Sequence, residues 1–256
     1  MLLTRTNSKT AFSGGNIPVF RTTQAEDDLF NMGVSSWIET GERFIRTDPA
    51  GRVTGLIDRA NSDVLTPAGA APKIINAGIS ALSFDKTPML GNVDVFGSND
   101  VQTLITVCRA VPGNVDVIVG SQAADARPLM LFVDRPDDSA MRYLQRYPDN
   151  QINSTKPVKN LGWFSCVFSY SLLRPQAVFY INGAQVTKPG PVTGTLSKAA
   201  NAKRIAIGGA GVAGAQLPGT FDFALSITLP DIAAHEDPAA LAKINALLTE
   251  FMSKLK

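Results

Sequence analysis

The sequence predicts an all-β protein, built as a sandwich or a barrel. Three observations carry this prediction. About a dozen short apolar or alternating runs are separated by Pro, Gly, Asn and Asp, as in sandwiches and barrels. The pair Asn182-Gly183 stands between two such runs and is a strong hairpin signal. Helical periodicity is confined to the last twenty residues, and a length of 256 residues suits one large domain.

The first 36 residues show neither sustained helical nor strand periodicity. They are polar and contain Gly14-Gly15 and the acidic cluster Glu26-Asp27-Asp28. We therefore expect residues 1–36 to form an extended N-terminal arm, and residues 37–256 to form the β domain.

From Trp37 onward the pattern is one of strands and turns. Apolar or alternating runs predict strands at 53–57, 79–84, 103–108, 115–119, 129–133, 163–168, 178–181, 204–209 and 219–227. The glycine-rich stretch 208–214 is too short to link domains and is expected to be a tight loop between strands.

The end of the chain predicts one amphipathic helix over 238–255. Asp237-Pro238 suits an N-cap followed by proline in the first turn. Apolar residues then recur at spacings of three and four, at Leu241, Ile244, Leu247, Leu248, Phe251 and Leu255.

Charge and hydropathy indicate which kinds of partner the protein is expected to lack. The formal net charge is +2 and no long basic run occurs, so we expect no nucleic-acid partner. No apolar stretch approaches the ~18 residues of a membrane span, so we expect no membrane partner. The N-terminus lacks the apolar core of a signal peptide, which predicts synthesis in the cytoplasm without export by that route. The two cysteines, Cys108 and Cys166, lie in apolar runs, and their pairing stays open.

Two blocks of sequence resemble the concanavalin A-like lectin and glucanase superfamily, in particular its laminin-G-like jelly-roll modules from bacterial secreted proteins and tailed-phage virions. The resemblance implies an all-β, two-sheet antiparallel jelly-roll sandwich with an extended N-terminal arm (1–36), a laminin-G-like domain (37–256) and one C-terminal helix. The first block covers 48–62 and continues through Phe84-Asp85; it differs from the family pattern at Leu56, where tryptophan is usual, and at Lys86, where glycine is usual. The second contains the strand from Trp163, the hairpin at 180–183, the strand at 205–209 and the return at 219–227, in family order.

The catalytic residues of enzymes in this superfamily are missing from this sequence. Glycosidases of this superfamily carry an E-x-D-x-E strand, which places carboxylates on one face, and no such pattern occurs here. Asp94 and Asp116 are the nearest substitutes and lie on separate strands. Lyases of the fold need a strand histidine and a tyrosine, whereas His235 is the only histidine and falls in a polar turn, where we expect a solvated side chain. We therefore expect no enzyme activity, with a glycosidase or lyase as the lesser alternative.

Metal and ligand candidates are few. The superfamily often binds calcium, and oxygen ligands for a structural ion exist at Asp58, Asn61, Asp63 and Asp85, although such residues also form turns. No other cofactor is expected, and no zinc pattern occurs. Among the large rings, Trp163 and Tyr180 belong to core motifs.

An exposed contact for a ligand or a partner is predicted elsewhere. Tyr143 and Tyr147 alternate with polar residues, including Arg146, and indicate a polar strand face. Together with Trp37 they are the candidate contact residues. A solvated strand edge is the alternative interpretation of the same pattern.

These observations lead to two expectations about function. The first is a non-catalytic structural or adhesive virion protein of a tailed phage, in the capsid decoration or the tail. In this case the protein is made in the host cytoplasm, forms a homo-oligomer and contacts other virion proteins through its N-terminal arm. The alternative is a lectin module that recognises a host cell-surface polysaccharide.

Overall fold

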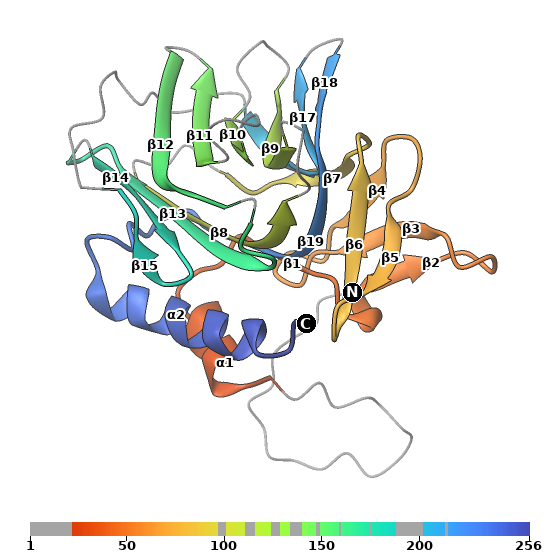
Figure 1. Ribbon diagram of the computed structural model, residues 1–256, viewed down its shortest axis with the longest axis horizontal. Helices are drawn as coiled ribbons and strands as arrows, with labels where there is room; N and C mark the ends of the chain where they lie inside the picture. The colour runs from red at the N-terminus through yellow and green to blue at the C-terminus, as the bar shows by residue number, and fades with distance from the viewer. Residues whose placement is uncertain are drawn as a thin grey trace.

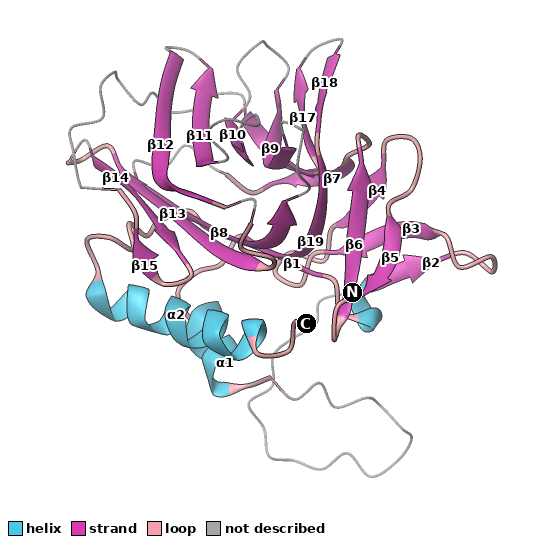
Figure 2. Ribbon diagram, in the orientation of Figure 1, coloured by secondary structure: helices cyan, strands magenta, loops and turns pink. Residues whose placement is uncertain are grey.

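The computed structural model describes residues 22–96, 101–110, 116–123, 129–133, 140–146, 149–158, 160–174, 176–187, 202–212 and 215–256. These residues form two sheets and two α-helices, with a short 3₁₀ turn, η1 (Glu42–Phe44) (Figure 1, Figure 2). The prediction of an all-β, two-sheet antiparallel sandwich with a C-terminal helix is confirmed. No helix in the described part of the chain is long and apolar enough to cross a membrane.

The first sheet has the strand order β15-β14-β13-β8-β19-β6-β5, and β1 pairs separately with β19. All of these pairings are antiparallel. The strands are β1 (Ser36–Glu39), β5 (Lys73–Asn76), β6 (Ser80–Asp85), β8 (Val101–Ala110), β13 (Phe164–Ser171), β14 (Gln176–Ile181), β15 (Ala184–Gln185) and β19 (Thr220–Leu229).

The second sheet has the order β12-β11-β10-β9-β16-β7-β4-β3-β2, with the β17–β18 hairpin joined to β9. Only the short β17–β9 contact is parallel among the described pairings. The strands are β2 (Ile45–Thr47), β3 (Val53–Ile57), β4 (Val64–Pro67), β7 (Met89–Asp94), β9 (Asp116–Ala123), β10 (Leu129–Val133), β11 (Ala140–Arg146), β12 (Asp149–Pro157), β16 (Ala202–Ile207), β17 (Gly209–Val212) and β18 (Ala215–Pro218).

The central strands of the first sheet are buried on both faces. Along β13, Phe164, Cys166 and Phe168 belong to the core shared with the second sheet, whereas Val167 belongs to a separate core beneath the helices. This alternation follows from the two-residue period of a strand. Because both faces are covered, every residue of β13 is buried.

A register shift in β19 exchanges its two faces. Phe221 and Phe223 pack in the core between the sheets, but Leu225 and Ile227 pack beneath the helices. The register with β8 shifts between Phe223 and Leu225, as in a β-bulge. One additional residue moves every later side chain to the opposite face. The bulge therefore lets one strand contribute large side chains to both cores.

Helix α2 (Pro238–Met252) covers the outer face of the first sheet, near β13 and β15 (Figure 1). It begins where the sequence predicts, because Asp237 accepts hydrogen bonds from the backbone N–H groups of Ala239 and Ala240. Its buried face carries Ile244, Leu247 and Leu248. The predicted helix extends to residue 255, three residues beyond the observed end.

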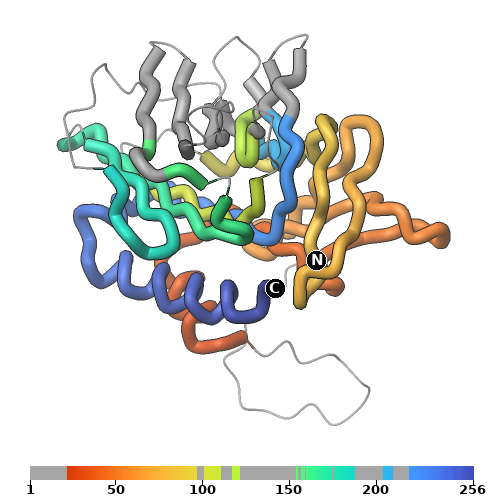
Figure 3. The backbone as a smooth tube through the Cα atoms, in the orientation of Figure 1, coloured from red at the N-terminus to blue at the C-terminus, as the bar shows by residue number. Residues whose placement is uncertain are grey.

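Part of the predicted N-terminal arm is helical. Residues Gln24–Phe30 form α1, which lies beside α2 (Figure 3). Thr23 caps the helix by accepting from the N–H of Glu26, and acidic residues in the first turn favour its N-terminal end. Leu29 is 0% exposed. The helix contains too few apolar positions to show a period, which is why this segment reads as extended; residues 1–21 lie outside the described part.

Two predicted turns have different outcomes. Asn182 and Gly183 have positive φ values of 51° and 75° and join β14 to β15, which confirms the hairpin. The stretch 208–214 was expected to be a loop, but Gly209–Val212 form β17 and pair with β18. Backbone hydrogen bonds hold this pair, so its strands need no large side chains. Residues 213–214 lie outside the described part.

Candidate functional site

An open groove lies between the β2–β3 turn and the connection from β4 to β5; we call it the β3–β4 groove. It belongs to the part of the molecule that carries β2 to β5, away from α2 (Figure 1). Its volume is about 600 Å³, a size typical of small-molecule sites. Its walls comprise Asp48, Arg52, Val53, Thr54, Thr66, Pro67, Gly69, Ala70 and Ala71.

Asp48 organises the turn at one wall of this groove. Its Oδ1 atom accepts the backbone N–H groups of Ala50 at 3.0 Å and Arg52 at 2.9 Å. Its Oδ2 atom accepts the Arg52 guanidinium through Nε at 2.7 Å and Nη2 at 2.7 Å. The backbone N–H of Arg52, followed by its guanidinium, holds the pKa of the Asp48 carboxyl below its usual value. Asp48 is therefore an ionised anchor that orients Arg52.

Arg52 and two threonines provide the polar groups of the groove. The Arg52 side chain is 77% exposed, and only two of its N–H donors bind Asp48. Thr54 and Thr66, from the neighbouring strands β3 and β4, are both exposed. Hydroxyl groups donate and accept, whereas the guanidinium only donates. The groove therefore combines hydrogen-bonding side chains with the apolar surfaces of Pro67 and neighbouring alanines.

Sequence reasoning did not identify this groove. Residues 48–52 were noted only as part of a family-like block. The pattern of Asp48-Pro49 followed by Gly51-Arg52 was the available signal, since aspartate starts turns by accepting backbone N–H groups two and four residues later. The sequence could not show that β4 brings Thr66 to the same groove.

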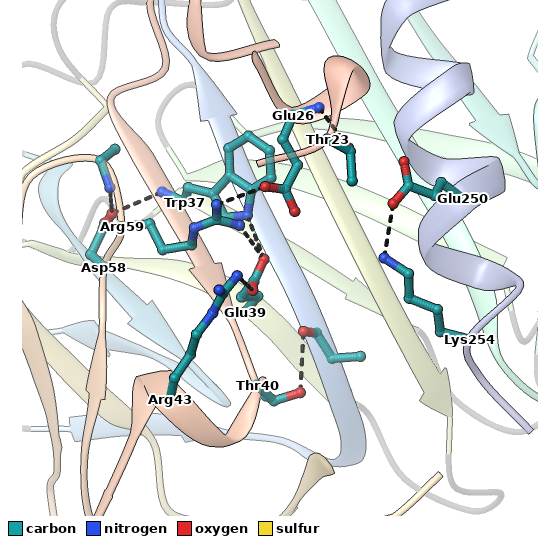
Figure 4. A network of polar contacts seen from close by, with 12 residues as sticks. Thr23, Glu26, Trp37, Glu39, Thr40, Arg43, Asp58, Arg59, Glu250 and Lys254 are labelled. Atoms are coloured by element: carbon teal, nitrogen blue, oxygen red, sulfur yellow. Dashed lines mark hydrogen bonds and ion pairs between the residues drawn. The ribbon is translucent and has the colours of Figure 1, made fainter. Parts of the chain in front are cut away.

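A second polar cluster lies in the interior around Arg59 (Figure 4). Its guanidinium binds Glu39 through Nη1 at 2.6 Å and Glu26 through Nη2 at 3.0 Å. Glu39 also accepts the indole N–H of Trp37 at 3.0 Å. Burial alone would lower the Arg59 pKa, but Glu39 and Glu26 raise it above the usual value. These contacts fasten α1 to β1.

One of the four predicted contact residues is buried. Trp37 is 1% exposed, with its ring stacked on Phe30 at 4.4 Å. It is a core residue because α1 covers it, so its assignment to an exposed contact is corrected. On β11, the register places Tyr143 opposite Leu131 and Ile152, and Arg146 opposite Asp149. Tyr147 lies outside the described residues. Trp163 and Tyr180 are buried, as predicted.

The predicted calcium ligands serve local structure. Asp58 is 0% exposed and accepts hydrogen bonds from Ser36 Oγ and from the backbone N–H groups of Trp37 and Ala60. Burial raises its pKa, and these hydrogen bonds oppose the shift. Asp63 accepts the N–H groups of Asn92 and Val93, 2.6 and 3.1 Å away. Across the described residues there is no cluster of three or more His, Cys, Asp or Glu suited to a metal.

His235 is not solvated as predicted. Its side chain is 4% exposed, and Nδ1 lies 2.7 Å from Ser169 Oγ. The turn before α2 folds against β13 and β8, where Thr103 also binds the backbone of residue 234. The expectation of a solvated loop histidine fails because the sequence does not show this packing. Cys108 and Cys166 are both free and buried, so no disulfide joins them.

Comparisons with solved structures find chains of similar fold at 10–15% sequence identity. A scan against known protein families finds no match, and no curated protein sequence matches either. Domain 4 of AbnA, an extracellular GH43 arabinanase from Geobacillus stearothermophilus, has a TM-score of 0.53 at 10% identity. That structure is a complex with arabinotriose, and the match covers 76% of this chain and 91% of that one.

Sialidases are further structural neighbours. A Trypanosoma rangeli sialidase, solved with difluorosialic acid, has a TM-score of 0.55 at 11% identity, over 85% of this chain and 33% of that chain. A NanB sialidase from Streptococcus pneumoniae has a TM-score of 0.49 at 13% identity. This chain covers only 28% of that one.

These neighbours correct one expectation and leave another as a prediction. The sequence predicts a protein without enzyme activity, but the structural neighbours with TM-scores above 0.5 are a sialidase and a domain of an arabinanase, which contradicts that prediction. At these identities the likeness shows a β-sandwich fold. None of the three neighbours is a virion protein by description, so the virion role, the homo-oligomer and the partner contacts of the arm stay predictions.

Proposed function

We propose that this chain is a carbohydrate-binding β-sandwich and that the β3–β4 groove holds the sugar. The single observation that supports this most is the match to arabinanase domain 4, which was solved with arabinotriose and is matched over 91% of its length. The match thus spans nearly the whole of that domain. The sialidase neighbours agree with the same ligand class.

The chemistry of the groove suits sugar hydroxyls. A sugar hydroxyl can accept from the free N–H groups of Arg52 and can exchange hydrogen bonds with Thr54 and Thr66. The C–H face of a sugar ring can pack against Pro67. The groove is open along its length, so it can admit a chain as well as a single ring. Asp48 contributes by holding Arg52 in one orientation, which reduces the entropy lost on binding.

A calorimetric titration with a glycan panel tests this proposal. The panel contains arabinotriose, longer arabinan oligosaccharides and a sialylated trisaccharide. For the oligosaccharide that binds, we expect Arg52→Ala to weaken binding roughly tenfold, because a charge-assisted hydrogen bond is lost. Thr66→Val, which keeps the side-chain shape, should weaken it by a smaller factor.

A matched control is Lys254→Ala, which removes an exposed cation in the last turn of the chain, away from the groove. The affinity of this variant for the oligosaccharide should equal that of the unmodified protein. Equal affinities of Arg52→Ala and the unmodified protein would show that the β3–β4 groove does not hold the sugar. Absence of binding across the whole panel would remove the proposed function.

A further inference from the structure

A second groove lies between the β14–β15 hairpin and α2; we call it the α2 groove. Its volume is about 550 Å³. No charged side chain lines it, which separates it chemically from the β3–β4 groove. The lining residues are Ser165, Asn182, Gly183, Ala184, Asn245, Leu248, Thr249 and Met252.

One wall of the α2 groove holds a buried acceptor that lacks a partner. The Oδ1 atom of Asn245 is shielded from solvent, and no described residue donates a hydrogen bond to it. It faces the hairpin, because a Cβ atom placed on Gly183 would lie 3.9 Å from it. A buried acceptor without a donor costs free energy, so this atom is suited to a ligand N–H or O–H group.

The opposite wall presents a donor held in a fixed orientation. Asn182 Oδ1 accepts the backbone N–H of Ser165 at 2.8 Å, and the Asn182 N–H donates to the Ser165 carbonyl at 3.0 Å. The first bond holds the Oδ1 side of the amide, so Nδ2 is the donor of the side chain, and the second fixes the backbone that carries it. Asn182 itself is exposed and sits in the left-handed region at φ 51°.

The two walls together match a secondary amide. In a trans amide the N–H and C=O groups point in opposite directions. An N–H aimed at Asn245 and a C=O aimed at Asn182 would satisfy both walls at once. The apolar side chains of Leu248 and Met252 provide a surface for a small methyl group. A simple hydroxyl ligand also donates and accepts, but it would leave the methyl surface unused.

We propose that the α2 groove binds the acetamido group of an N-acetylated sugar. The amide N–H donates to Asn245 Oδ1, the amide carbonyl accepts from Asn182 Nδ2, and the acetyl methyl packs on Leu248 and Met252. This site shares no lining residue with the β3–β4 groove. Binding in the α2 groove can therefore be tested separately from binding in the β3–β4 groove.

A pair of disaccharides isolates the acetamido group. N,N′-diacetylchitobiose and cellobiose have the same linkage and differ only where an acetamido group replaces a hydroxyl group. In calorimetric titrations we expect the N-acetylated sugar to bind at least roughly tenfold more tightly, the effect of satisfying a buried polar group. Equal affinities, or no binding of either sugar, would overturn the proposal.

Three variants locate the binding. Asn245→Ala removes the acceptor from a half-buried helix position that alanine suits, and Asn182→Gly removes the amide while tolerating the positive φ. Each should weaken diacetylchitobiose binding roughly tenfold. Arg52→Ala, in the other groove, should leave it unchanged. Thermal unfolding of each variant shows that it is folded, and unchanged affinity in both folded asparagine variants would contradict the proposal.

A capped peptide distinguishes the source of the amide. N-acetylglycine N-methylamide carries the same acetyl group without a sugar. We expect it to bind more weakly than diacetylchitobiose, because the ring contacts are missing. Equal or tighter binding of the peptide would reject the sugar and indicate a peptide site. Side-chain amide signals of Asn245 and Asn182 in nitrogen-15 spectra should shift with the sugar; their constancy at saturation would also reject the assignment.

Discussion

The Nδ1 atom of His235 lies 2.7 Å from the hydroxyl oxygen of Ser169, which joins the turn before α2 to the middle of β13. The backbone N–H of His235 also donates to this oxygen, at 3.3 Å. Ser169 is thus placed to donate its hydroxyl proton to Nδ1. A hydroxyl proton donated to Nδ1 corresponds to a neutral imidazole with its proton on Nε2, which is buried and has no hydrogen-bond partner among the described residues.

Stability is therefore expected to fall in mild acid. Burial lowers the pKa of His235 in the folded chain, and Glu236, 3.8 Å away, opposes this shift. The unfolded chain takes up a proton as the pH falls through about 6.5, while the folded chain does not. The free energy of unfolding should then be constant above that pH and should fall below it.

Urea unfolding of the unmodified protein and His235→Asn, between pH 7.5 and 5, measures this effect. The variant should lose the decline due to His235. Asp58, whose pKa burial raises, has the opposite influence in acid and is common to both proteins, so it cancels in the difference. Identical pH dependence in the two proteins would contradict the role given to His235.

Arg59 is expected to be the most sensitive charged residue of the interior. Its side chain is 8% exposed and lies between Glu26 and Glu39. Arg59→Ala removes the guanidinium from Glu26 and leaves Glu39 with only Arg43, 3.9 Å away, which should cost about 3 kcal/mol of unfolding free energy. Lys254→Ala, in an exposed pair with Glu250, should cost about 0.5 kcal/mol or less. Chemical denaturation measures both, and similar losses would show that the Arg59 network does not fasten α1.

Helix α1 is expected to be part of the folded unit. Leu29→Ala removes a side chain with 0% exposure from the buried face of α1 and should lower the free energy of unfolding by about 3 kcal/mol. The same substitution at Leu173, which is 73% exposed, should change stability by less than about 0.5 kcal/mol. Equal effects at the two positions, measured by urea midpoints, would mean that α1 does not pack on the domain.

Both cysteines are expected to be inert in the folded protein. Cys108 and Cys166 are each 0% exposed, and burial strongly raises the pKa of the Cys166 thiol. A thiolate is needed for reaction with disulfide reagents, so neither residue should react until the chain unfolds. A thiol assay before and after addition of denaturant measures this. Rapid labelling of either cysteine under native conditions would contradict the packing of β8 against β13.

The elements that the sequence predicts correctly are those whose signals lie within a few neighbouring residues. The strands at 53–57 and 129–133 have the predicted bounds because turn residues enclose short apolar runs. The hairpin at Asn182 and the cap at Asp237 were also visible, since their signals lie within a few residues. Helix α1 and strand β17 were missed because neither has an apolar period.

The sites depended on distant parts of the chain. Arg59 binds two carboxylates that lie 20 and 33 residues earlier in the sequence, and no local sequence pattern predicts such a cluster. The same holds for the α2 groove, whose walls come from a hairpin at 182 and a helix at 245. Trp37 was predicted to be exposed because the helix that covers it was not expected.

A map of backbone amide shifts in nitrogen-15 spectra, recorded during titration with the oligosaccharide that binds, tests most directly whether the β3–β4 groove holds the sugar. We expect the largest shifts at Arg52, Thr54 and Thr66, around the β3–β4 groove, and we expect them to saturate with the calorimetric affinity. Shifts confined to other strands, or none at millimolar sugar, would contradict carbohydrate binding at this groove.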